Sequence, residues 1–83
     1  MSQAQVMLPD QAWEGVEPGV LALVDRWLVP EGTRVKAGQP LVRVVLVKST
    51  MQVEAPVTGV LGQVLVRAGR NFARGQPLGL MEG

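Results

Sequence analysis

Lys48 is the residue of this sequence with the clearest chemical potential. It stands in the stretch VRVVLVKSTMQVEA, residues 42–55, where apolar runs lie on both sides of it. Burying an unpaired cation is strongly unfavourable, so the pattern predicts that a strand ends here and that the lysine lies at an exposed turn. Exposure explains how the charge is tolerated, but it does not explain what the amine is for. The other lysine, Lys36, is interpreted as a solvated surface charge.

The rest of the composition excludes most other chemistry. The chain has no cysteine and no histidine, so it lacks a thiolate nucleophile, the commonest general base and the commonest metal ligand, and no metal site is expected. Its seven acidic residues show no pairing suited to acid–base catalysis. The net charge is +1, and Trp13, Trp27 and Phe72 are the only aromatic residues, so no nucleic-acid binding is expected. We therefore expect a domain that is not an enzyme by itself.

The chain reads as strands and turns. Its longest unbroken apolar run is VLALV at 20–24, so no membrane association is expected. Ten glycines and six prolines separate short runs rich in Val and Leu, which is typical of an all-β sandwich or barrel. With 83 residues, we expect one domain that spans residues 1–83. The expected strand segments are QVML, VLALV, RWLV, PLVRVVLV, MQVEA, GVLGQVLV and PLGLM.

A repeat divides the chain into two similar halves. LVPEGTRVKAGQPL at 28–41 matches LVRAGRNFARGQPL at 65–78 with an offset of 37 residues. Each copy predicts a strand, a turn at glycine, one apolar residue, a second glycine turn and another strand. We expect the halves to pack face to face about a pseudo-twofold axis, with Val35 and Phe72 at equivalent places. The repeated apolar residues should supply core contacts, with about one of each adjacent pair facing inward. They are Leu28, Val29, Leu41, Leu65, Val66 and Leu78.

The region between the halves carries a family resemblance. Lys48 falls in the hairpin that joins them, with Gly38 ten residues before it and Gly59 eleven residues after it, and APVTG follows at 55–59. Over residues 6–82 this pattern resembles the biotinyl/lipoyl domain family. The resemblance implies a flattened β-barrel of two four-stranded antiparallel sheets with pseudo-twofold symmetry. It also implies that Lys48 is the covalent attachment point of a lipoyl or biotinyl group.

Several features are closer to the lipoyl branch of that family. VMLP at 6–9 is similar to the V-x-M-P opening of lipoyl domains, and RWLVPEGTRVKAGQPL at 26–41 is similar to their W-L-V-x-x-G-D-x-V-x-x-G-D-x-L motif, with Trp27 on its tryptophan. The biotinyl branch usually has Met on each side of its lysine, whereas Val47 and Ser49 flank Lys48 here.

The lipoyl resemblance implies a carrier function. Lipoate on Lys48 would form a swinging arm that moves acyl groups or reducing equivalents between active sites of a cytoplasmic multienzyme complex. With biotin instead, the chain would be a biotin carboxyl carrier-like domain and its cargo would be carboxylate. The expected setting is a 2-oxoacid dehydrogenase complex, in a protein of the dihydrolipoamide acyltransferase type. A separate lipoate or biotin ligase would attach the group, and the complex's enzymes would be the partners.

The sequence departs from the lipoyl pattern at three places, one of which is the pair of Gly-Asp motifs, where Thr33 and Gln39 stand in place of aspartate. Val45, Leu46 and Val47 stand where lipoyl domains have E-T-D, and β-branched residues are poor turn formers. An apolar tip favours a second hypothesis: an unmodified interaction module, with weak self-association through Val45–Val47. Upstream, Ala22 stands ten residues before Gly32 where the family usually has glycine, so either alanine replaces that glycine or residues are inserted. Nearby Trp13 is expected in a loop that covers one barrel end, and Trp27 in packing against a sheet.

Overall fold

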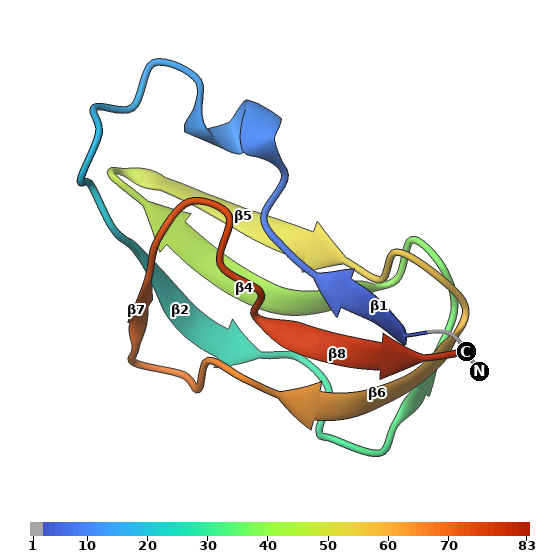
Figure 1. Ribbon diagram of the computed structural model, residues 1–83. Helices are drawn as coiled ribbons and strands as arrows, with labels where there is room; N and C mark the ends of the chain where they lie inside the picture. Colours follow the sequence, from blue (N-terminus) through green and yellow to red (C-terminus); the bar gives the residue numbers. More distant parts are fainter. Residues whose placement is uncertain (1–2) are drawn as a thin grey trace.

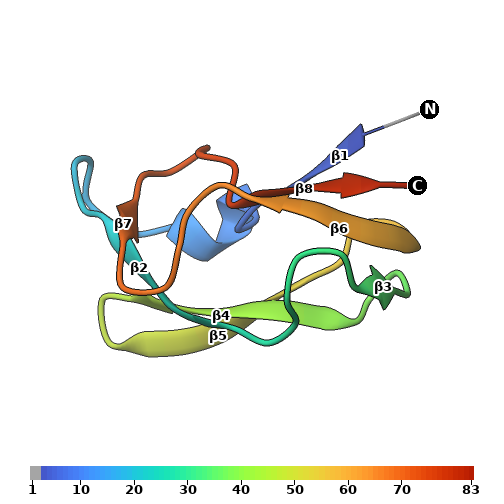
Figure 2. The same ribbon diagram turned by 90° about the horizontal axis from the view of Figure 1, so that it is seen from below.

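The computed structural model describes residues 3–83 and is an all-β sandwich (Figure 1). Two four-stranded antiparallel sheets have the strand orders β1-β8-β6-β3 and β5-β4-β2-β7, and they face each other across the core (Figure 2). This is the predicted fold. Within residues 3–83, no helix has the length and apolar character needed to cross a membrane. The elements are β1 (Gln3–Val6), the 3-10 helix η1 (Asp10–Trp13), β2 (Ala22–Trp27), β3 (Arg34–Val35), β4 (Pro40–Leu46), β5 (Ser49–Glu54), β6 (Gly59–Val64), β7 (Asn71–Phe72) and β8 (Gly79–Glu82).

The two halves are related by the predicted pseudo-twofold axis. The bounds of β6 and β7 are those of β2 and β3 shifted by 37 residues. The Gly32 N–H donates to the carbonyl oxygen of Leu61 at 2.7 Å, and its counterpart Gly69 donates to that of Val24 at 2.8 Å. Both glycines have positive φ, 89° and 87°, which explains why glycine recurs at this turn. Even the register irregularities repeat, one after Val24 in β2 and one after Leu61 in β6.

The repeated apolar residues do supply the core, with one difference from the prediction. Leu41 and Leu78 are completely buried, as are Val35 and Phe72 to within 2%. Of the adjacent pair Leu65–Val66, only Val66 is buried. The equivalent pair at 28–29, which follows β2 as Leu65–Val66 follows β6, is half-buried at both positions.

Some expected strand boundaries were wrong. VLALV and RWLV are parts of one strand, β2, which continues through the irregularity after Val24. In VMLP, only Val6 belongs to a strand, because β1 begins earlier, at Gln3. Ala22 begins β2 at the place that Gly59 has in β6, so alanine replaces the family glycine without an insertion in the strand. At Gly59 itself, a Cβ would collide with the backbone carbonyl oxygen of Glu82, so the packing of β6 against the end of β8 demands glycine.

One connection breaks the symmetry. β5 reaches β6 through residues 55–58, whereas the equivalent connection from β1 to β2 is the much longer segment 7–21. This segment contains η1, where a loop was expected. Trp13 is buried and packs edge-on against Phe72, with ring centroids 6.0 Å apart. It thus covers one end of the barrel, as predicted.

Candidate functional site

Lys48 lies at the tip of the β4–β5 hairpin, as the sequence predicts. Leu46 and Ser49 are the last paired residues of the two strands, so the turn consists of Val47 and Lys48 alone. Such two-residue connections fix the strand register and hold the turn residues in defined positions. The side chain of Lys48 is exposed. The hairpin therefore presents one amine at the end of a rigid pair of strands.

The turn has an unusual backbone conformation. Val47 has φ 60°, and it is the only residue besides glycine with positive φ among residues 3–83. A positive φ at the first turn position, and not at the second, is the pattern of a type II′ turn, which favours glycine at the first position. A β-branched residue in this region is a genuine outlier. The chain thus places local strain directly beside the exposed lysine.

The amine of Lys48 has no competing partner in the described part of the chain. The ion pairs found in residues 3–83 join Arg43 to Asp25 at 3.1 Å and Arg74 to Asp10 at 2.7 Å, and neither includes Lys48. A group attached through an amide on this nitrogen would therefore disrupt no contact seen here. An exposed, unpaired amine on a short turn fits the attachment chemistry that the family resemblance implies.

The tip exposes less apolar surface than the sequence suggested. Alternation along β4 turns Val44 and Leu46 inward, and Leu46 is only 2% exposed. Val45 is half-buried, while Val47 is 66% exposed. The prediction that Val45–Val47 form a self-association surface is therefore wrong for Leu46, because its side chain belongs to the core. The apolar surface exposed at the tip consists of Val47 and part of Val45.

A second exposed apolar residue lies at the same end of the molecule as the tip. β2 and β4 are antiparallel, with Leu23 opposite Val45, so Leu21, which precedes β2, and Val47, which follows β4, lie at the same end of this strand pair. Leu21 is 52% exposed. Figures 1 and 2 both show the chain before β2 and the β4–β5 turn at the same end of the molecule.

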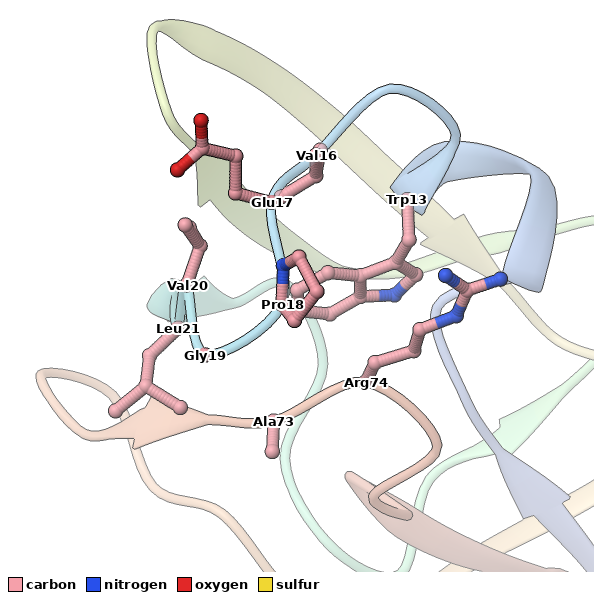
Figure 3. A pocket seen from close by; sticks show the side chains of 9 residues that line it. All are labelled: Trp13, Val16, Glu17, Pro18, Gly19, Val20, Leu21, Ala73 and Arg74. Atoms are coloured by element: carbon pink, nitrogen blue, oxygen red, sulfur yellow. The ribbon is translucent and has the colours of Figure 1, made fainter.

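The long connection forms a pocket at this end, which the sequence analysis did not identify. We call it the loop pocket. Residues 16–21 line it together with Trp13, Ala73 and Arg74, and its volume is about 270 Å³ (Figure 3). Two contacts hold its walls in place: the packing of Trp13 on Phe72, and two hydrogen bonds from the Arg74 guanidinium to the Asp10 carboxylate at 2.7 and 2.9 Å. The sequence signal was weak, because EGVEPG indicates only a turn-rich loop.

The other tryptophan has a packing role. Trp27 is half-buried, its Nε1 donates to the carbonyl oxygen of Val66 at 2.9 Å, and its ring approaches Gly79 so closely that a Cβ there would lie 3.0 Å from it. This confirms the interpretation made from the sequence. Lys36 is also exposed, at the turn between β3 and β4, as expected.

Comparisons with known proteins agree with this geometry. A family model described as "Biotin-requiring enzyme" matches residues 5–81. Among solved structures, the chain is similar to the solution structure of the lipoyl domain of the 2-oxoglutarate dehydrogenase complex from Azotobacter vinelandii. The TM-score is 0.74 with 26% sequence identity, and the match covers 95% of this chain and 96% of that one. No curated protein sequence gives a significant match.

Proposed function

This chain belongs to the biotinyl/lipoyl domain family and is closer to its lipoyl type; from that premise we propose that it is a lipoyl-type carrier domain with Lys48 as its attachment point. Domains of this family are non-catalytic carriers. The observation that carries the proposal is the position of Lys48: an exposed amine on a two-residue turn at one end of the barrel. The two sheets hold the hairpin that carries this amine.

Attachment would require little of the domain itself. The Lys48 nitrogen would attack the carbonyl carbon of an activated acyl compound supplied by a ligase. A C–N bond forms, the activating group leaves, and the nitrogen gives up its extra protons to solvent. When bound, lipoate would supply a dithiolane that accepts acyl groups or reducing equivalents. The domain's role is to hold the root of the arm on a rigid hairpin and raise its local concentration at partner active sites.

The proposed setting is a multienzyme complex of the 2-oxoacid dehydrogenase type. Support comes from the similar solved domain, whose title places it in a 2-oxoglutarate dehydrogenase complex. The proposed partners are a lipoate ligase and the enzymes between which the arm moves. We propose residues 1–83 as one carrier unit, because a single pair of sheets with one core contains every described strand.

Intact mass measurement after co-expression with a lipoate ligase tests this proposal. We expect a lipoyl increment on the parent protein and on Lys36→Arg, and none on Lys48→Arg. Because Lys36 and Lys48 are the two lysines of the chain, this pair of variants assigns the site without ambiguity. A protein that stays unmodified while a known lipoyl domain is modified in the same cells would contradict the proposal.

The same measurement with a biotin ligase tests the two alternatives. A biotin increment on Lys48 would identify a biotin carboxyl carrier-like domain. If neither ligase modifies the protein, an unmodified interaction module becomes the better description. The exposed apolar side chain of Val47 at the tip favours that second function.

A further inference from the structure

We propose that a second pocket, formed by equivalent residues of the two halves, is a docking site for an acidic peptide segment of a partner protein. We call it the axis pocket. The segment would place one aromatic or large apolar side chain in the pocket and a neighbouring carboxylate on the guanidinium of Arg67. This inference goes beyond the carrier function and does not depend on whether Lys48 is modified.

The first argument is that the two halves build this pocket together but give it unlike chemistry. The pocket has a volume of about 320 Å³ and lies between the connections 28–33 and 65–70. Three pairs of its lining residues are separated by the repeat offset of 37 residues: Trp27 and Val64, Pro30 and Arg67, Glu31 and Ala68. A strictly symmetric pocket would carry the same side chains twice. Here one half supplies the cation and the other supplies the aromatic ring and the acid.

The second argument is that the walls are held in place before any ligand binds. Trp27 Nε1 donates to the carbonyl oxygen of Val66 at 2.9 Å, and the Glu31 carboxylate accepts a hydrogen bond from the Val64 N–H at 2.6 Å. The Trp27 ring is nevertheless only half-buried, so part of it is available to a ligand. A preformed aromatic surface binds an apolar side chain with little loss of conformational freedom.

The shape of the pocket favours a peptide over a small molecule. Four of its lining residues, Pro30, Glu31, Arg67 and Ala68, are exposed. Small-molecule sites usually enclose most of their ligand, which this open pocket cannot do. A side chain that belongs to a longer segment fits better, because the rest of the segment contacts the exposed rim.

The third argument is the distribution of charge. The ion pairs found in residues 3–83 do not include Arg67, and a backbone N–H already occupies one oxygen of Glu31. The two connections together contain one acidic residue and two arginines, whereas the segment 7–21 contains three acidic residues and no basic one. Figure 1 shows η1 at the top of the molecule and the two connections, teal to green and orange, at the bottom. An acidic partner would therefore be attracted to the side of the axis pocket.

The position of the pocket leaves the hairpin tip free. Trp27 pairs with Val42, and Val47 lies five residues further along the chain. At about 3.3 Å per residue, the turn is roughly 16 Å further along the strand direction. A partner at the axis pocket would thus hold the domain by its middle without covering Lys48.

The two tryptophans provide the readout. Trp27 lines the axis pocket, whereas Trp13 is buried against Phe72. Two-dimensional nitrogen–proton NMR would follow the unmodified protein during titration with the peptide acetyl-EEFEE-amide. We expect a saturable shift of the Trp27 indole signal and of the amide signals of residues 29–31 and 67–68. The Trp13 indole and residues 46–49 should not change, and acetyl-KKFKK-amide should cause no such shift.

Arg67→Ala and Arg70→Ala form a matched pair of variants. Both arginines are exposed, lie in the same connection and are absent from the ion pairs of residues 3–83, but only Arg67 lines the pocket. Arg67→Ala should weaken binding of the acidic peptide by about fivefold or more, because it removes the charge-assisted hydrogen bonds to the peptide carboxylate. Arg70→Ala should leave the binding nearly unchanged.

Three outcomes would overturn the inference. Equal effects of the two arginine variants would indicate general charge attraction without a site. Absence of a saturable Trp27 shift, or an equal response to the basic peptide, would show that the pocket does not select an acidic segment. Light scattering on the protein alone gives the third: a mass that rises with concentration and is lost in Arg67→Ala would identify a second copy, and not a partner protein, as the occupant.

Discussion

Val47 holds a left-handed backbone conformation, φ 60°, immediately before the exposed Lys48. The strain lies at the position from which an arm would extend, and the exposed Val47 side chain offsets little of it by burial.

Val47→Gly is expected to raise the free energy of unfolding by about 1 kcal/mol. Glycine removes the left-handed penalty of a side chain, and its greater freedom in the unfolded chain offsets part of this gain. Chemical denaturation measures the change. Val45→Gly is the matched control, because it places glycine in the extended interior of β4 and should destabilise the protein. Equal effects of both variants would contradict a strained Val47.

Changing Val47 to Asp together with Ser49 to Ala should give a protein at least as stable as the parent and less prone to self-association. Aspartate tolerates turn conformations better than valine. The substitution also replaces the most exposed apolar side chain of the tip, that of Val47, with a charged one. Lipoylation by a ligase should rise if the tip is a poor modification site. If the tip is instead a docking surface, partner binding should fall. Light scattering and intact mass separate these outcomes, and unfolding of the variant would contradict the exposed position of Val47.

Leu41→Ala and Leu78→Ala should each lower stability by about 2–5 kcal/mol, because each removes a completely buried side chain. The two residues occupy equivalent places in the repeat, so their effects should be similar. Thermal unfolding measures both. Leu65→Ala, at a side chain that is 44% exposed, should have a much smaller effect. An unchanged melting temperature for Leu41→Ala or Leu78→Ala would refute the symmetric core.

Asp10 should make a small contribution to stability that disappears at low pH. Hydrogen bonds from the Arg74 guanidinium hold the pKa of the Asp10 carboxyl below its ordinary value, although desolvation opposes them and the attraction of the two charges adds to them. A lowered folded-state pKa gives a contribution that is present above the ordinary carboxyl pKa and is lost as the pH falls through the lowered one. The difference in melting temperature between parent and Asp10→Asn should therefore be positive at neutral pH and vanish in acid. High salt should reduce it as well, since the pair is exposed.

The fold could be predicted because the sequence features that determine it, glycine turns between short apolar segments, are local and occur twice in the chain. A turn that needs left-handed backbone at Gly32 needs it again at Gly69, so the same residues recur at one offset. The place of Lys48 could be predicted for a related reason: a cation between two apolar runs is compatible with a turn but not with a buried strand.

What could not be predicted depends on contacts between distant residues. Whether Leu46 faces inward is decided by the pairing of β4 with its neighbours and not by its own apolar character. The loop pocket depends on Trp13 meeting Phe72 and on Asp10 meeting Arg74, which lie 64 residues apart in sequence. A non-periodic, turn-rich stretch gives no indication of such partners.

Gln3 pairs with Glu82, so the start of β1 and the end of β8 lie side by side at one end of the molecule. Figure 1 shows β1 beginning and β8 ending at the end of the molecule away from the β4–β5 turn. By the pseudo-twofold relation, β8 and β1 stand to each other as β4 and β5 do, but without a covalent turn between them. A circular permutant that joins the two termini through a short turn and opens the chain between Val47 and Lys48 would keep all the strand pairs. It would convert the lysine from a rigid tip into a free chain end. Fusion at either existing terminus, in contrast, leaves from the pole opposite Lys48, so a tethered domain would present its amine outward.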